Sequence, residues 1–444
     1  MRRLIFPFLL MLAQTAPAFP LDRAALSASI ADSDYSPVSL TKAKLGQLLF
    51  WDPILSGNRN VACATCHHPK FGTSDGVSLT LGEGGIGLGP DRKPDPDNLP
   101  LQRIARNTPA LFNLGAREFT ALFHDGRVAL DQSHPSGFKA PLDENMIVGF
   151  ASLLAVQSLF PMMSADEMAG HKDENEVSTA VRQGRIAGPD SASEIIAQRV
   201  AAIPGYQFYF AQAYPDISAG RPIRFSDISN AIAAFVSYEW RSDTSPFDRF
   251  LAGKGILSSQ ATAGVELFYG AAGCSVCHSG KFQTDHSFHA MGTPQLGPGT
   301  ADLIARNSRD MGRMGVTRDP ADAYAFRTPS LRNITLTAPY GHAGAHTRLP
   351  DFLAYHLNPR ANITAYTPDA ILPEFTPTKS DWALREDMED WGAIAAAVTT
   401  PATTLTEKEQ VEILAFLASL EDPIVTRGRL GVPDAVPSGL PVGQ

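Results

Sequence analysis

The sequence predicts a mainly α-helical protein of two similar halves, with irregular loops and little β structure. The pattern C-x-x-C-H occurs twice, at 63–67 and 274–278. A stretch with apolar residues at helical spacing leads into each copy, at 40–50 and at 258–270. A glycine- and proline-rich stretch, 81–100, follows the first copy and excludes a long regular element there. These observations indicate a weak internal duplication.

The repeated pattern is the attachment signature of c-type haem, and it uses all four cysteines of the chain. Two thiols three positions apart can bond to the two vinyl groups on one edge of a porphyrin, and the next histidine can then ligate the iron. We therefore predict two covalently bound haem c groups in two cytochrome c-like haem domains. The residues that hold them are Cys63, Cys66 and His67 in the first domain and Cys274, Cys277 and His278 in the second.

A zinc site or a pair of disulfides would also use cysteines spaced in this way. A four-cysteine zinc site would have to close a loop from residue 63 to residue 274, far longer than the loops of zinc ribbons. Neither alternative explains the histidine that follows each pair of cysteines. We therefore favour two haems over both.

The 444 residues suffice for two or three domains, and the formal charge of −9 excludes the basic field that nucleic acids attract. Two arginines, an apolar run and the site Ala16-Pro17-Ala18 predict a cleaved secretory signal, with a retained anchor as the alternative. No later stretch approaches the ~20 apolar residues of a membrane span. Because haem c is attached outside the cytoplasm, we expect a periplasmic protein without an integral membrane segment after signal cleavage.

Further helices are expected within 143–212, at 226–239 with an N-cap, and at 406–420 with a capping box. Residues 241–255 are expected to form the joint between the halves. The predicted organisation is a signal peptide at 1–18, an N-terminal haem domain at 19–245, a C-terminal haem domain at 246–425 and an extended tail at 426–444.

Four further motifs carry a family resemblance: NTPALFN at 107–113, FHDGR at 123–127, FRTPSLRN at 326–333 and LTAPYGHAGAHTRL at 336–349. With the two haem motifs, they resemble the bacterial dihaem cytochrome c peroxidase and MauG family from about residue 37 to residue 420. SPFDRFL, LFPMMSADEMAG and CSVCHSGKFQTDHSFHA look closest to the MbnH-like, methanobactin-associated branch. The resemblance implies a peroxide-reactive N-terminal haem and a C-terminal haem for electron transfer.

In peroxidases of this family, a histidine in the loop after the first motif caps the first haem at rest. Here that loop reads LTLGEGG, and no histidine lies between His68 and His124. We therefore expect an open or water-bound sixth position on the first iron. Glu83 could ligate or hydrogen-bond there, although we expect it to be a solvated loop carboxylate, and we expect His68 at the surface.

The resemblance places the distal ligand of the second haem a short way after Leu349, where the family has methionine or tyrosine. His356 occupies this place and is flanked by Tyr355. We expect His356 to ligate, which gives a bis-histidine iron of lower potential than a histidine/methionine pair. Tyr355 is the alternative ligand.

The family's acid-base group is a glutamate in an E-M pair, with a glutamine ten positions earlier. Glu167 and Gln157 match this spacing, and Glu144 is the other candidate. Such a group takes a proton from peroxide and returns it to the leaving oxygen. Where the family has a tryptophan between its haems, this chain has His124, and Arg127 is expected to pair with a haem propionate.

The resemblance also implies a calcium ion, bound by the side-chain oxygen of Asn107 and the carbonyls of Thr337 and Pro339. Asn107 as an ordinary turn residue is the alternative. Of the remaining histidines, we expect His171 at the surface.

We expect an enzyme that reacts with hydrogen peroxide at the first haem. Its electrons would come from a small cytochrome or cupredoxin donor, or from a tryptophan-type residue of a partner protein. A non-enzymatic electron carrier with two six-coordinate irons is the alternative from another functional class.

Overall fold

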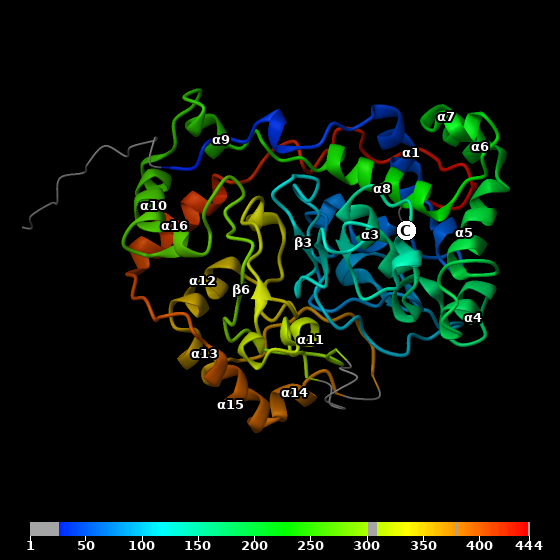
Figure 1. Ribbon diagram of the computed structural model, residues 1–444. Coiled ribbons are helices and arrows are strands. Elements are labelled where there is room, and N and C mark those ends of the chain that lie inside the picture. The colour runs from blue at the N-terminus through cyan, green and yellow to red at the C-terminus, as the bar shows by residue number, and fades with distance from the viewer. Residues whose placement is uncertain (1–25, 301–308, 378–379, 443–444) are drawn as a thin grey trace, which may run out of the picture.

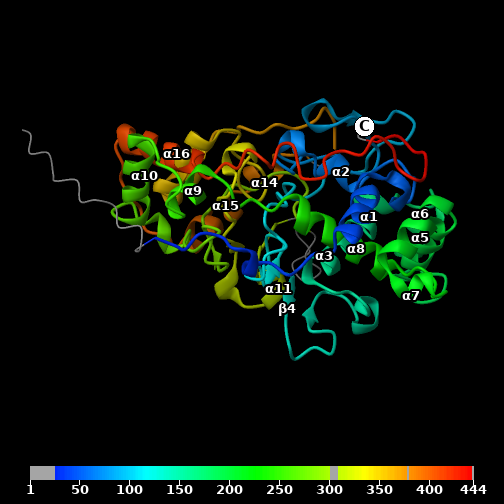
Figure 2. The ribbon, with the colours of Figure 1, turned by 90° about the horizontal axis from the view of Figure 1, so that it is seen from above.

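The computed structural model describes residues 26–300, 309–377 and 380–442; the predicted signal peptide at 1–18 lies outside these residues. Two lobes lie side by side in both views (Figures 1 and 2). The helices of the first lobe are α1 Leu40–Trp51, α2 Cys63–Cys66, α3 Leu153–Met162, α4 Glu176–Arg182, α5 Ala192–Ala201, α6 Pro204–Ala213, α7 Pro215–Ser218 and α8 Phe225–Glu239. Those of the second are α9 Pro246–Leu251, α10 Ser259–Tyr269, α11 Met314–Thr317, α12 Leu349–Leu357, α13 Pro359–Ala365, α14 Ala383–Glu386, α15 Met388–Ala397 and α16 Glu407–Ala418.

The strands are two or three residues long and form three small antiparallel sheets. Their bounds are β1 Gly85–Ile86 with β2 Lys93–Pro94; β3 Ala121–Leu122, β4 Val128–Leu130 and β5 Phe138–Lys139 in that order; and β6 Phe288–His289 with β7 Phe326–Arg327. The last sheet pairs Phe288 with Arg327, so it holds the FRTPSLRN segment against the loop after the second haem motif. The prediction of a mainly α fold with little β structure is confirmed.

The helix that precedes each haem motif packs through a glycine against a later helix of the same lobe. A Cβ on Gly46 of α1 would lie 1.9 Å from the carbonyl oxygen of Ala231 in α8. A Cβ on Gly264 of α10 would lie equally close to the carbonyl oxygen of Glu412 in α16. Only glycine permits such contact between backbones. The repeated arrangement confirms the internal duplication that the sequence suggested.

Two extended segments cross between the lobes, and both run from the second lobe to the first (Figures 1 and 2). At the N-terminal end, Leu26 packs against the core of the second lobe, and the chain then runs to α1 in the first. At the other end, residues 429–442 run back from the second lobe, and Leu430, Val436 and Leu440 pack against the core of the first. We call residues 429–442 the C-terminal strap.

A buried ion-pair network also joins the lobes. Arg106 contacts Asp125 in the first lobe at 2.7 Å and Asp310 in the second at 2.6 Å. Burial alone would raise the pKa of Asp310, but the charge of Arg106 outweighs it and holds this pKa well below its usual range.

No helix in the described part of the chain has the length and apolar character to cross a membrane.

Candidate haem sites and catalytic pocket

The two C-x-x-C-H motifs present their histidines in the same way. Nδ1 of His67 hydrogen-bonds to the carbonyl oxygen of Thr73 at 3.0 Å, and Nδ1 of His278 to that of Gln283 at 3.2 Å. A carbonyl only accepts, so Nδ1 carries the proton in both rings and Nε2 keeps its lone pair. A hydrogen bond of this kind orients a histidine ring so that its other nitrogen can bind a metal. Short turns form both motifs, α2 in the first and the 3-10 turn Cys274–Val276 in the second.

The four cysteines fit thioether attachment and not the two alternatives. None of them forms a disulfide. Within the described residues, the one metal-like group of histidine, cysteine and carboxylate side chains is Cys277, Asp285 and His289, so the two cysteine pairs do not combine into a zinc site.

The guanidinium of Arg327, next to the loop after the second haem motif, also fits a haem. Among the described residues, Arg327 contacts the carbonyl oxygens of Phe123 and Thr328, both at 3.3 Å, and no carboxylate. Burial lowers the pKa of Arg327 to about 10. Such a cation needs an anionic partner, which a haem propionate would provide. Arg127, the expected propionate partner, instead pairs with Asp125 at 3.0 Å and lies over the Phe123 ring at 3.5 Å.

On the second haem site the structure brings His356 towards His278. Burial, together with the charge of the nearby His356, lowers the pKa of His278 to about 4. Nδ1 of His356 hydrogen-bonds to the carbonyl oxygen of Phe352 at 3.1 Å, which again leaves Nε2 as the free ring nitrogen. Tyr355 is buried, and its hydroxyl donates to the carbonyl oxygen of Gly292. The geometry therefore favours His356 over Tyr355 as the distal ligand.

The first haem site has a carboxylate and an amide in place of a histidine. Glu167 lies on the π-helical turn Ala165–Ala169, a rare element that often occurs at functional sites. Burial raises the pKa of Glu167, although Ser164 and Arg127 oppose this shift. Its charge acts on the thiol of Cys66, which places it beside the first haem motif.

Gln157, on α3, also lies in this region of the first lobe and has a buried side-chain oxygen without a hydrogen-bond partner in the structure. Glu144, the other candidate, lies elsewhere and accepts a hydrogen bond from His134 at 2.7 Å. The helix α3 and the π-helical turn pack against each other, so they bring the predicted pair of Gln157 and Glu167 into one region.

The expectation that Glu83 is a solvated loop carboxylate is wrong. Glu83 is 1% exposed, and one of its oxygens accepts hydrogen bonds from the amides of Asn58, Asn60 and Asn98 at 3.0, 2.7 and 2.9 Å. Its backbone N–H donates to the carbonyl oxygen of Asp166, next to Glu167. The loop after the first motif is therefore fastened to the turn that carries Glu167.

The expectation that His171 and His68 lie at the surface is also wrong. His171 is 7% exposed, and its Nδ1 lies 3.2 Å from Glu174. His68 is half-buried, and its ring meets the Trp51 ring edge-on at a centroid distance of 5.4 Å. His171 lies against Asp166 and Glu174, and His68 lies against Trp51 of α1, contacts that the sequence pattern alone does not reveal.

His124 is half-buried and lies beside residues of both lobes. Burial lowers its pKa to about 3, with Arg106 and His342 acting in the same direction, so the ring is neutral at physiological pH. Its carbonyl oxygen accepts a hydrogen bond from the backbone N–H of Arg327 in the second lobe. Its position between the haems stays a prediction.

Asn107 is oriented by its amide group, which donates to the carbonyl oxygens of Val77 at 2.8 Å and Ser78 at 3.3 Å. Its side-chain oxygen therefore points the other way. Its backbone N–H donates to the carbonyl oxygen of His342, so it lies beside the segment that contains Thr337 and Pro339. Oxygen donors of this kind suit calcium.

Sequence reasoning missed two arginines. Arg327 is part of the FRTPSLRN motif, but nothing local marks its guanidinium as lacking a carboxylate. Arg92 is 2% exposed and donates to the carbonyl oxygens of Leu81, Gly82 and Gly87, so it holds the loop after the first motif in one shape. A single buried arginine within a glycine-rich stretch was the available signal for this role.

Comparison with known proteins places these sites in a family. The family model described as di-haem cytochrome c peroxidase matches residues 40–255. The methylamine utilization protein MauG of Methylorubrum extorquens is 30% identical over 350 residues, 77% of this chain and 78% of that protein. The cytochrome c551 peroxidase of Pseudomonas aeruginosa is 30% identical over 319 residues, 72% of each chain.

Solved structures agree on the fold. The crystal structure of a MauG-like protein associated with microbial copper homeostasis has a TM-score of 0.56 and 24% identity, with 93% of this chain and 96% of that chain covered. The diheme peroxidase BthA from Burkholderia thailandensis has a TM-score of 0.57 and 19% identity, with 92% and 91% covered. The chain therefore belongs to the dihaem cytochrome c peroxidase and MauG family of oxidoreductases, whose members carry two haem c groups.

Proposed function

We propose that this protein reduces hydrogen peroxide at its first haem and uses the oxidising equivalents to oxidise a protein partner. The observation that carries the proposal is the contrast between the two haem sites: the charge of His356 acts on His278, whereas the charge of Glu167 acts on Cys66, and Gln157 lies on the helix packed against the Glu167 turn. When bound, the haem iron supplies the position at which peroxide binds. The residues around it supply the proton transfers.

In this proposal Glu167 is the acid-base group. Its carboxylate takes the proton from the near oxygen of peroxide and returns it to the far oxygen, which then leaves as water. Burial raises its pKa, which suits a group that has to hold and release a proton in turn. The free side-chain oxygen of Gln157 can accept a hydrogen bond from peroxide and orient it.

Two kinds of electron source fit the family: a small cytochrome, as the name cytochrome c551 peroxidase indicates for one relative, or a residue of a partner protein. We favour a partner-protein residue because the loop that would carry the capping histidine holds Glu83 instead, so the first iron needs no prior reduction. This loop is fastened by Arg92 and by three asparagines, which supports a first site that is permanently ready.

The test is peroxide mixing with the oxidised holoprotein, followed by addition of reduced cytochrome c. We expect a high-spin first haem at rest, a long-lived oxidised state after peroxide and slow turnover of the cytochrome. Fast, saturable cytochrome oxidation would instead assign a peroxidase. A purely low-spin protein that ignores peroxide would assign the electron carrier.

We further propose that the protein is periplasmic and binds one calcium ion through Asn107, Thr337 and Pro339. The apolar N-terminus followed by small residues supports export. The orientation of the Asn107 amide supports the ion site. Removal of calcium by a chelator, followed by measurement of the haem spectrum and of bound calcium, tests the second proposal.

A further inference from the structure

Two tryptophans lie in the core beside the first haem motif. Trp51, the last residue of α1, and Trp240, which follows α8, are each 1% exposed. Phe50 lies between them, with ring centroids 6.3 Å from Trp51 and 5.1 Å from Trp240. Trp51 also meets His68, the neighbour of the proximal ligand His67, at 5.4 Å. A continuous set of rings therefore runs from the proximal side of the first haem into the core.

Each of these tryptophans is next in sequence to a buried carboxylate that forms no direct ion pair among the described residues. Asp52 is 0% exposed and accepts hydrogen bonds from the Tyr206 hydroxyl at 2.7 Å and the Ser438 hydroxyl at 2.7 Å. Among the described residues it has no ion-pair partner. Its negative charge lies one residue from Trp51 in a region of low dielectric.

The same arrangement recurs at Trp240. Glu239 is 2% exposed and accepts hydrogen bonds from the backbone N–H groups of Arg429, Leu430 and Gly431 at 3.0, 2.6 and 2.8 Å. Within the described part of the chain this carboxylate also lacks a direct ion pair. The C-terminal strap thus provides the hydrogen bonds that keep both carboxylates buried.

The C-terminal ends of two helices add to the negative potential of these carboxylates. Trp51 ends the twelve-residue α1 and Trp240 caps the fifteen-residue α8. The C-terminal end of a helix carries a partial negative charge of roughly half a unit. Neither indole N–H has a hydrogen-bond partner in the structure. Both rings therefore lie where a positive charge is stabilised and where no bonded acceptor can take the indole proton.

We propose that Trp51 and Trp240 form a reservoir for one oxidising equivalent on the proximal side of the first haem. Reduction of one hydrogen peroxide to two waters takes two electrons and two protons. Trp51 would supply one of these electrons and become a radical cation, the haem groups that His67 and His278 would hold would supply the other, and solvent would supply the protons. Trp240 can then donate an electron to the Trp51 radical and is itself oxidised. The reductant or protein substrate finally reduces the oxidised tryptophan.

This inference rests on the proposed reaction with peroxide. It assigns a role to two tryptophans away from the position between the haems at which the sequence has His124. It also makes Trp51 and Trp240 the sites of oxidative modification when substrate is absent, because an unfilled indole radical reacts further with oxygen or water.

The test mixes substrate-free holoprotein with hydrogen peroxide, records the organic radical by electron paramagnetic resonance and maps oxidised residues by mass spectrometry. Ring-deuterated tryptophan identifies the radical. We expect a tryptophan signal in the parent protein, its loss in W51F, its reduction in D52N, and no change in W382F, whose tryptophan lies in the second lobe. Haem absorption spectra verify that each variant binds both haems, and W51Y replaces W51F if that variant does not fold.

A tryptophan signal that persists in the W51F/W240F double variant, or oxidation confined to other residues, would overturn the reservoir while leaving the peroxide reaction intact. A parent protein whose haem spectrum does not respond to peroxide would overturn both proposals. An unchanged radical in D52N would remove the electrostatic part of the argument.

Discussion

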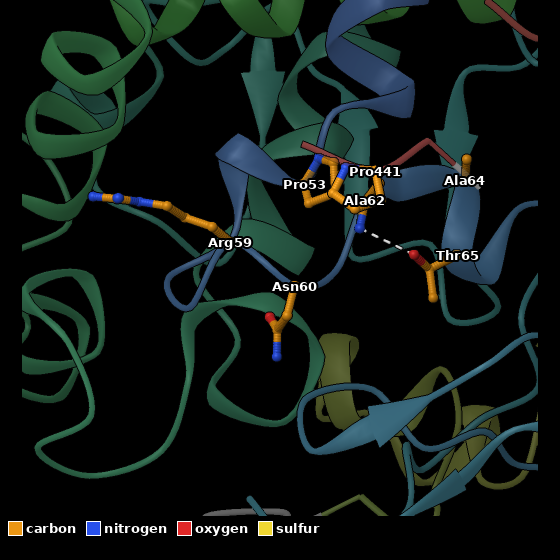
Figure 3. Close-up of a pocket in the computed structure, with 7 residues that line it drawn as sticks. All are labelled: Pro53, Arg59, Asn60, Ala62, Ala64, Thr65 and Pro441. Carbon is orange, nitrogen blue, oxygen red and sulfur yellow. Dashed lines mark hydrogen bonds between the residues drawn. The ribbon is translucent and has the colours of Figure 1, made fainter. Parts of the chain in front are cut away.

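Thr65 and Val276 occupy the same place in the two haem motifs, yet Thr65 is 5% exposed and Val276 is 78% exposed. The first motif lies under other segments: a pocket of about 140 Å³ beside it is lined by Ala62, Ala64 and Thr65 together with Pro441 of the C-terminal strap (Figure 3). In that view Pro441 lies next to Ala62. In the second motif Val276 faces solvent, whereas the cysteines and His278 are half-buried.

This difference extends to the distal sides. The charge of His356 acts on His278 in the second site, and the charge of Glu167 acts on Cys66 in the first. Exclusion of bulk water suits the acid-base chemistry that we propose for the first site. The exposed Val276 of the second motif suits the exchange of electrons with a partner that we propose for the second. The two motifs share one sequence pattern, but the residues that the fold places around them differ.

Among the variants considered, substitution of Glu167 by glutamine should have the largest effect on the difference between the two haem sites. An amide cannot take the proton from peroxide, so we expect the rate of the peroxide reaction to fall by about 10²- to 10⁴-fold. Stopped-flow absorbance of the haems measures this rate. E144Q is the matched control, because Glu144 lies apart and pairs with His134. Equal rates in E167Q and the parent protein would refute the role of Glu167.

D310N tests whether the two lobes depend on each other. Arg106 would keep Asp125 but lose its second buried partner, so we expect a loss of about 3 kcal/mol in the free energy of unfolding. Because the pKa of Asp310 lies below its unfolded value, its contribution is present at neutral pH and is lost as the pH falls through the folded-state pKa.

Denaturant unfolding followed by haem absorbance measures this loss. D173N removes an exposed carboxylate near Arg182 and should change stability by less than about 0.5 kcal/mol. If D310N were no more harmful than D173N, the lobes would not rely on this network.

H356M should change the difference in reduction potential between the two haems. Methionine in place of histidine raises the reduction potential of a haem, so we expect a higher potential for the second haem and little change at the first. Spectroelectrochemical titration separates the two potentials. Y355F is the control, since it removes only the hydrogen bond to Gly292. A shift in Y355F as large as that in H356M would reassign the ligand.

Acidification should produce the smallest and most gradual effect. Glu167 acts in its ionised form, and burial raises its pKa above the ordinary value of ~4.3. As the pH falls, the peroxide rate should therefore decline earlier than an exposed glutamate would allow. The pH profile of the rate measures this, and E167Q should flatten it. A profile shared by E167Q and the parent protein would assign the titration to another group.

Local patterns in the sequence predicted the helices and the attachment chemistry. Apolar spacing gave α1, α8, α10 and α16 almost to the residue, because each buries apolar residues in the core, most of all in the pairs α1 with α8 and α10 with α16. The placement of Glu167 near the first motif followed from a family pattern and agrees with the effect of its charge on Cys66, although its catalytic role stays a prediction.

Contacts between distant segments escaped prediction. Glu83 was expected in solvent because its glycine-rich surroundings suggest a surface loop, but Asn58, Asn60 and Asn98 converge on it from both sides in sequence. The tail was expected to be extended, and no helix or strand occurs in its described residues. Its binding to Glu239 uses backbone N–H groups, which leave no trace in the choice of side chains.

The C-terminal strap also bears on how the protein matures. Synthesis runs from the N-terminus, so residues 429–438 are made after both haem motifs. Until they dock, Asp52 and Glu239 lack hydrogen bonds that keep them buried at the ends of α1 and α8. The ends of α1 and α8 therefore gain these hydrogen bonds only after both haem motifs have been synthesised.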